Sequence, residues 1–150
     1  MPTGAKLISA AFYGFLTYIA AHIVHHTFEV EIGYEQDFGL FKEITAVIGG
    51  LVGWKVQGPR VGEGYYLAIQ GGFITSVAIV FWGLVLWALV EMINESMKMK
   101  YKGAMHAIKD SFMIAIEYAK TIAVPEFIIT MAVGALIGGI LAEYTSSRFR

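Results

Sequence analysis

The chain has 150 residues, of which 57% are hydrophobic and only 15% charged, and its formal net charge is −1. About a quarter of the residues of a soluble domain are charged, so this composition predicts a membrane protein that forms one compact unit. The near-neutral charge gives no sign of a nucleic-acid partner, and the absence of cysteine excludes disulfides, thiolate metal sites and thiol redox chemistry.

Stretches without Asp, Glu, Lys or Arg predict where the chain crosses the membrane. A hydrocarbon core of about 30 Å takes about 20 helical residues to cross. Three such stretches are long enough, and they predict spans over about 6–27, 64–93 and 125–143. A further uncharged stretch, Ile44 to Trp54, is too short to cross alone. Residues 43–57 are therefore predicted to form a short span, a re-entrant segment or a buried helix, in an all-α protein with three to four transmembrane helices.

Aromatic residues flank the second long stretch. Tyr65 and Tyr66 stand at one end and Trp87 at the other; Trp87 is 21 positions after Tyr66, which is about 31 Å along a helix. Aromatic belts mark the two interfaces of a bilayer at about that separation. The three residues are therefore predicted to mark the membrane boundaries.

Residues 97–123 have apolar side chains at a spacing of three and four, which is typical of an amphipathic helix. The opposite face carries several lysines, and a basic amphipathic helix lies along anionic headgroups. We expect four lysines to contact the membrane interface: Lys98, Lys100, Lys102 and Lys109. The alternative is a solvated face on a connecting segment. Residues 112–116 are apolar all round, so this part could instead enter the space between the spans.

The orientation in the membrane depends on whether residues 43–57 cross it. The positive-inside rule favours a cytoplasmic position for the lysines of residues 98–102. With four full spans, the acidic segment 29–37 lies on the same side as those lysines. If residues 43–57 do not cross, the acidic segment and the lysines lie on opposite sides, and both arrangements stay open.

Small residues recur four apart within the apolar stretches. Gly49 with Gly53, and Gly134 with Gly138, each place small side chains on one helix face, where they permit close packing of helix backbones in lipid. These faces indicate either packing inside the bundle or contact with a partner subunit. Polar groups within the third predicted helix, such as Thr75 and Gln70, are candidates for hydrogen bonds between helices.

Three histidines form the one cluster that has the spacing of a metal site. His22, His25 and His26 stand at i, i+3 and i+4, so they can share a helix face, with Glu29 one turn further on. Such a set can bind zinc or copper or hold a haem or chlorophyll-type cofactor. The alternative is that the rings lie at the membrane interface without a ligand. No other cofactor site is indicated, and no nucleophile–base arrangement predicts an enzyme.

Short motifs spread over nearly the whole chain, in one order, carry a resemblance to a known family. They are Met1-Pro2-Thr3, Asp37-Phe38-Gly39, Ile48-Gly49, Gly53-Trp54-Lys55-Val56, Phe81-Trp82-Gly83, Glu117-Tyr118, Pro125-Glu126 and Leu141-Ala142-Glu143. In these motifs the chain resembles the TrgA-like tellurite-resistance membrane proteins of alphaproteobacteria. The resemblance implies a small multi-pass protein of the bacterial inner membrane that is linked to tellurite resistance, and it assigns no site residues.

The composition limits what such a link could mean. Reduction of tellurite by thiols needs cysteine, and this chain has none. The sequence therefore favours a non-enzymatic accessory subunit that packs against other membrane subunits, possible hosts being a respiratory or photosynthetic complex. The alternative is a small transporter or a metal- or cofactor-binding protein that uses His22, His25 and His26.

Overall fold

The protein is an all-α membrane protein. The computed structural model describes residues 4–32, 39–97 and 104–148, and within these ranges the chain is helical and has no strand. The elements, in chain order, are α1 (Gly4–Ile32), α2 (Phe41–Val52), the π-helical turn η1 (Gly53–Gln57), the 3₁₀ turn η2 (Gly58–Arg60), α3 (Tyr65–Met97), α4 (Ala104–Ile122) and α5 (Pro125–Arg148).

Three of these helices are long and apolar enough to cross a membrane, and they fall where the uncharged stretches predict them. The candidate spans are Gly4–Thr27, Tyr65–Asn94 and Pro125–Arg148. Pro125 begins α5, where its fixed φ suits the first helical turn and its missing N–H leaves no bond unmade. The protein is therefore a multi-pass membrane protein.

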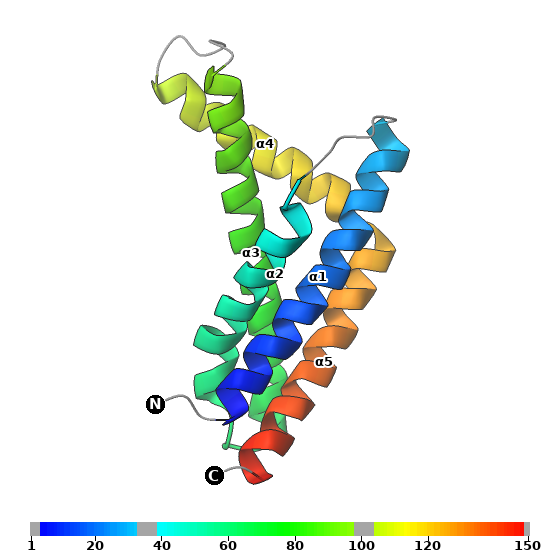
Figure 1. Ribbon diagram of the computed structural model, residues 1–150, viewed down its shortest axis with the longest axis vertical. Coiled ribbons are helices and arrows are strands. Elements are labelled where there is room, and N and C mark those ends of the chain that lie inside the picture. Colours follow the sequence, from blue (N-terminus) through cyan, green and yellow to red (C-terminus); the bar gives the residue numbers. More distant parts are fainter. Residues whose placement is uncertain (1–3, 33–38, 98–103, 149–150) are drawn as a thin grey trace.

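The described helices form an up-and-down bundle. Helices α1 and α3 run in one direction, and α2 and α5 run back, so that both ends of the chain lie at the same end of the bundle (Figure 1). The C-terminal ends of α1 and α3 both lie at the other end, which we name the upper end. The membrane sides of the acidic segment 29–37 and of the lysines of residues 98–102 stay a prediction, because most of these residues lie outside the described ranges.

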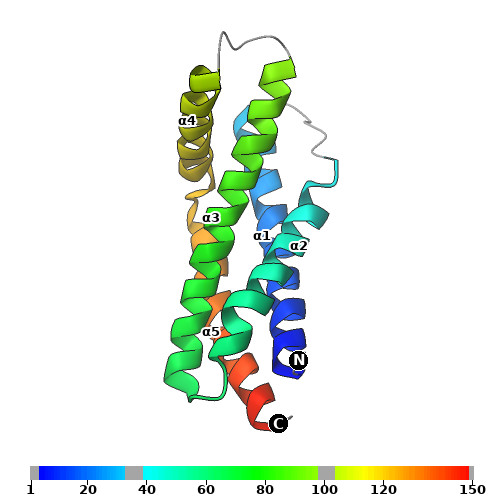
Figure 2. The same ribbon diagram turned by 90° about the vertical axis from the view of Figure 1, so that its left-hand side faces the viewer.

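Residues 41–60 form one unbroken helical segment without a reversal, made of α2, η1 and η2. It packs chiefly on α1 and begins at about mid-height of the bundle, so it covers only the lower half (Figures 1 and 2). Its buried side is formed by Ile48, Gly49, Val52, Gly53 and Gln57. The segment that was too short to cross by hydropathy is therefore a helix held against α1.

Tyr13 lies at the centre of the lower half and is completely buried. Glycines from four other elements, α2, η1, α3 and α5, surround it. A Cβ added at Gly53 would lie 2.9 Å from the Tyr13 Cβ, and one at Gly138 would lie 2.7 Å from the Tyr13 hydroxyl. A Cβ at Gly49 would lie 2.7 Å from the Tyr13 carbonyl, and Gly134 packs against the Leu16 side chain. The structure thus places all four predicted packing glycines inside the bundle.

Helices α3 and α5 approach each other most closely through small residues. Gly72 packs against the carbonyl of Ala135, and a Cβ at Gly139 would lie 2.6 Å from the carbonyl oxygen of Ala68. Because backbone atoms oppose each glycine, no side chain can move aside to accept a larger residue. The glycine content of the chain is therefore largely explained by its internal packing.

Two polar contacts fix the lower half. Gln57 is fully buried; its Nε2 donates to the Ala68 carbonyl at 3.0 Å, and its Oε1 accepts from the Thr75 hydroxyl at 3.3 Å. The Glu143 carboxylate accepts from the backbone N–H groups of Gly62 and Gly64, at 2.7 and 3.1 Å. Both glycines have positive φ, so the turn before α3 presents its N–H groups to the carboxylate.

Thr75 therefore makes a predicted interhelical hydrogen bond, whereas Gln70 is exposed. Gln57 takes the place that was expected for Gln70. Gln57 lies in the π-helical turn η1, whose i to i+5 spacing shifts side chains relative to the preceding α-helix. A search for side chains at the spacing of an α-helix therefore does not predict that Gln57 faces the interior of the bundle.

Helix α4 crosses the upper end obliquely, between the ends of α3 and α5, and packs mainly on α3 (Figure 1). It begins at Ala104 rather than at 97, and α3 continues to Met97 rather than ending at 93. The outward side of α4 is apolar at Met105, Ile108, Phe112 and Ile116, all of which are exposed. Phe112 is 68% exposed. At least part of residues 112–116, which are apolar all round, therefore stays outside the bundle.

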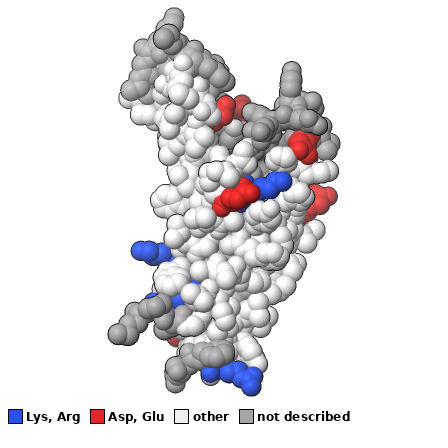
Figure 3. Space-filling view, viewed as in Figure 1, with Lys and Arg blue, Asp and Glu red and all other residues white. Residues whose placement is uncertain are grey.

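Among the described residues, charge is distributed unevenly between the two ends. On the face shown in Figure 3, acidic side chains gather mainly over the upper half, and basic side chains gather toward the lower end near the termini. Much of the surface between is uncharged, as the apolar environment of a bilayer requires. Lys98, Lys100 and Lys102 lie outside the described residues, and Lys109 is exposed on α4.

Candidate functional site

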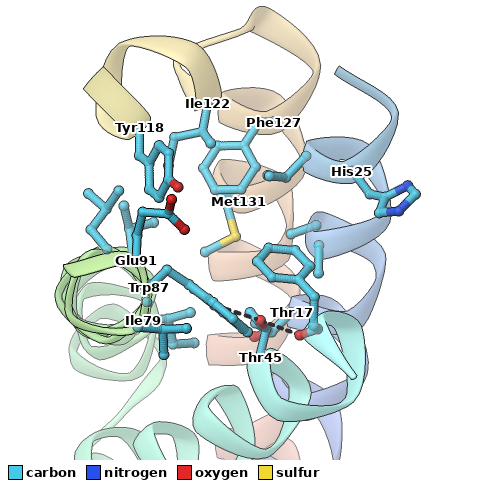
Figure 4. Close-up of a pocket in the computed structure, with 18 of the residues that line it drawn as sticks. Thr17, His25, Thr45, Ile79, Trp87, Glu91, Tyr118, Ile122, Phe127 and Met131 are labelled. Atoms are coloured by element: carbon cyan, nitrogen blue, oxygen red, sulfur yellow. Dashed lines mark hydrogen bonds between the residues drawn. The ribbon is translucent and has the colours of Figure 1, made fainter. Parts of the chain in front are cut away.

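The upper half of the bundle contains a cavity of about 280 Å³. Side chains from all five α-helices line it (Figure 4). It lies at the start of α2, which contributes Phe41 and Thr45 to the wall, and α4 crosses over this space at an angle instead of filling it as a parallel helix would. The cavity therefore follows from the shortness of α2 and the oblique path of α4.

Most of the wall is apolar. Small side chains of α1 form one side, and branched, aromatic and sulfur-containing side chains of the other helices form the rest. The apolar wall residues include Ala20, Ala21, Val24, Ile79, Val80, Leu84, Ile122, Phe127 and Met131. A mostly apolar wall with a few polar groups is typical of a small-molecule site.

Two threonine hydroxyls in the wall are already engaged by the backbone. Thr17 donates to the Tyr13 carbonyl at 2.5 Å, and Thr45 donates to the Phe41 carbonyl at 2.6 Å. Each hydroxyl has one proton, so neither is a nucleophile held by a neighbouring base. These groups shape the cavity, and their oxygens can accept further hydrogen bonds.

Trp87 points inward and closes the cavity against α2. Its indole Nε1 donates to the Thr45 hydroxyl at 3.2 Å, and its ring lies 4.6 Å from the Phe41 ring, centroid to centroid. The ring is half-buried. Its N–H group is bonded within the protein rather than exposed at the surface, and its place at a membrane boundary stays a prediction. Tyr65 and Tyr66, at the other end of α3, are exposed.

Glu91 supplies the acidic group of the wall. It stands four residues after Trp87 on α3, is half-buried, and directs its carboxylate toward the space between α3 and Tyr118 (Figure 4). In the part of the chain that the structure describes, no Lys, Arg or His forms an ion pair with Glu91, and the wall contains no Lys or Arg. Asn94, one turn further along α3, adds an amide.

An apolar groove of about 490 Å³ adjoins the cavity. It runs between α3 and α5 below α4, and the two spaces share the wall residues Val80, Leu84, Ile122, Phe127 and Met131. Beyond this shared wall the groove is bordered by outward residues of α3 such as Phe73, Val77 and Phe81, which are exposed. The cavity therefore lies beside a groove that faces the lipid.

The histidine cluster forms no closed site. His22 and His26 are exposed, and His25 is half-buried with its Nδ1 3.1 Å from the Glu29 carboxylate. His25 borders the cavity, but its ring points away from the other labelled residues (Figure 4). Among the described residues, no three His, Asp or Glu side chains gather as a metal site would require. Glu117 and Lys120 are both exposed on α4.

The sequence contains a pattern of residues that line this site, but the pattern can be recognised only once the fold is known. Residues at every fourth position of α3, a row that winds slowly around the helix, face α2 and then the cavity. They are Gly71, Thr75, Ile79, Gly83, Trp87 and Glu91. Glu91 directly follows the longest uncharged stretch. From the sequence alone, a charged residue at this position indicates the end of a transmembrane span rather than part of a binding site.

No family model, curated protein or solved structure matches this chain. The resemblance to TrgA-like proteins therefore stays a prediction, and the geometry of the cavity carries the functional argument.

Proposed function

We propose that the protein is a non-enzymatic membrane protein that binds a small amphiphilic molecule in the upper half of its bundle. The observation that supports this proposal is that the cavity, which contains polar groups, lies directly beside the apolar groove. The cavity has a polar end at Glu91 and Asn94, and the groove beside it is apolar and faces the lipid. A molecule with a polar head and an apolar tail matches both.

The polar end would determine affinity. Lipid tails are as apolar as the groove, so moving an alkyl chain from the bilayer into the groove gains little from the hydrophobic effect. The free energy of binding must come from contacts in the cavity and from close packing along its walls. The cavity volume of about 280 Å³ suits a head group rather than a large cofactor.

This proposal favours the binding alternative, but it does not use the histidines. It also bears on the predicted link to tellurite. Tellurite is an oxyanion, and a wall that contains a carboxylate and no Lys or Arg among the described residues disfavours an anion. Any link to tellurite resistance would therefore be indirect, in keeping with a small protein of a bacterial inner membrane.

A second candidate function is that of an accessory subunit in a larger membrane complex. The observation in its favour is the exposed apolar row of α4, Met105, Ile108, Phe112 and Ile116. The glycine faces do not add to it, because they are buried against neighbouring helices. Co-purification with a larger complex after mild detergent extraction, lost when Phe112 and Ile116 are changed to Ser, would support this role.

The binding proposal can be tested by filling the cavity. A Cβ added at Gly83 meets no atom within 4 Å, and Gly83 lines the cavity, so Gly83→Leu should fold and occupy part of the space. Binding of decyl amphiphiles can be followed by the fluorescence of Trp87 in a Trp54→Phe/Trp82→Phe background. We expect saturable binding that Gly83→Leu weakens at least tenfold. Unchanged binding in a folded Gly83→Leu protein would refute the site.

A further inference from the structure

We propose that the cavity selects a cationic head group, so that the ligand is a single-chain amphiphile carrying an ammonium group. This inference rests on the proposed function and specifies its ligand. It is carried by the juxtaposition of one carboxylate, Glu91, with several aromatic rings in a wall that has no Lys or Arg among the described residues.

The carboxylate provides the charge complement. Glu91 is half-buried on α3, and no basic residue of the described chain forms an ion pair with it. An ionised carboxylate at membrane depth is costly unless a positive charge accompanies it. A bound ammonium group supplies that charge from the ligand, and the attraction is stronger at a half-buried carboxylate than in bulk water.

The aromatic rings provide a second reason for a cation. Phe41, Trp87, Tyr118 and Phe127 contribute to the wall, and the Trp87 ring is fixed by its bond to Thr45 and its contact with Phe41. Aromatic faces attract cations, and cages of such rings recognise quaternary ammonium groups in particular. The same rings offer nothing to an anion, whose charge the ring faces repel.

Other cations fit less well. Calcium is bound by six to eight oxygen ligands, and magnesium demands near-octahedral oxygen geometry. No three His, Asp or Glu side chains gather in the described part of the chain. An alkylammonium ion needs no ordered ligand shell. Its substituents favour apolar surroundings, and its charge is satisfied by one carboxylate and several rings.

The adjoining groove explains why the ligand should carry an alkyl chain. Cavity and groove share five wall residues, and the rest of the groove lies against the lipid between α3 and α5. An ammonium group beside Glu91 can therefore extend its chain past Phe127 and Met131 toward the bilayer. The groove that adjoins the cavity accommodates one alkyl chain in this direction.

The test compares probes that differ only in their head group. Purified protein in dodecyl maltoside micelles, in the Trp54→Phe/Trp82→Phe background, is titrated with decyltrimethylammonium, decanol, decanoate and tetramethylammonium while Trp87 fluorescence is recorded. The same titrations are made with Glu91→Gln, which keeps the shape of the side chain. Glu117→Gln, on the exposed side of α4, is the matched control.

We expect decyltrimethylammonium to bind saturably and with higher affinity than decanol or decanoate. Glu91→Gln should weaken this binding at least about tenfold, because unit charges about 4 Å apart in a partly buried site attract by more than one decade in affinity. Glu117→Gln should have no effect. Tetramethylammonium should bind more weakly than the decyl cation, because it makes no contacts in the groove.

The outcomes separate the two proposals. If Glu91→Gln leaves the affinity for the cation unchanged, or if decanoate binds as tightly, selection for a cation is wrong. Binding of neutral decanol that Gly83→Leu still abolishes would then preserve the proposed function. Equal affinity for tetramethylammonium would overturn the assignment of the groove to the alkyl chain. If no probe gives a saturable response, both proposals are refuted.

Discussion

The close contact between α3 and α5 makes a sharp prediction for Gly139. A Cβ added there would lie 2.6 Å from the carbonyl oxygen of Ala68 and 2.7 Å from the Cα of Ile69, whereas ordinary contacts begin near 3.4 Å. Both opposing atoms belong to a helix backbone, so neither can rotate away. In Gly139→Ala the two helices must therefore separate by about 0.8 Å at this point.

The expected loss of stability follows from two opposing terms. Forcing an extra carbon into a packed interior costs about 1–3 kcal/mol. Replacing glycine by alanine in a helix returns at most about 1 kcal/mol, and less where the unfolded state in detergent keeps its helices. We therefore expect Gly139→Ala to lower the free energy of unfolding by about 1–2 kcal/mol.

Gly83→Ala is the matched control, because it makes the same substitution inside a membrane helix where a Cβ meets no atom within 4 Å. It should change stability by less than about 1 kcal/mol, in the stabilising direction. The measurement is equilibrium unfolding of both variants in mixed micelles with increasing sodium dodecyl sulfate. If Gly139→Ala proves as stable as Gly83→Ala, the close contact between α3 and α5 is refuted.

Two further predictions concern buried polar groups. Glu143→Ala removes two charge-assisted hydrogen bonds to the turn at Gly62 and Gly64, so we expect the free energy of unfolding to fall by about 1.5–3 kcal/mol. Limited proteolysis should cut this turn faster in Glu143→Ala than in the control variant Glu63→Ala. An equal rate of cleavage in the two variants would count against the contact. Tyr13→Phe removes a buried hydroxyl that has no hydrogen-bond partner in the described protein, so the variant should be equally stable or more stable by about 1–3 kcal/mol. A marked loss of stability in Tyr13→Phe would show that the hydroxyl has a partner, such as a bound water.

The sequence was sufficient for the long helices because their prediction depends only on where charge is absent. The spans over 6–27, 64–93 and 125–143 needed no knowledge of neighbours. The directions of side chains could not be predicted in the same way. Helix α3 is apolar all round, so no periodicity indicates that Trp87 turns inward or that Tyr66 stays exposed. Those directions are set by the helices that pack on α3, which are chiefly α5 and α4 and, over part of its length, α2.

The position of Gln57 shows a related limit. Hydropathy places it at the end of a short, ambiguous segment, and its role depends on the π-helical turn that aims it at Ala68 and Thr75. The glycine motifs were easier to locate than to interpret. Spacing alone left internal packing and partner contact open, and the choice between them required knowing that Tyr13 occupies the space in front of Gly53 and Gly138.

The length of α2 connects the packing of the bundle to its proposed function. In the lower half, the row on α3 that begins at Gly71 and Thr75 packs tightly against Gln57. That row continues through Trp87, which contacts Phe41 and Thr45 at the start of α2, to Glu91, where no described part of α2 runs beside it. Helix α4 closes the space only obliquely. A helix two turns longer at the start of α2 would fill the cavity and bury Glu91 against apolar side chains, at a high cost for an ionised carboxylate. The short α2 is therefore what allows an acidic residue to stand within the bundle, and a cationic ligand is what would make that position favourable.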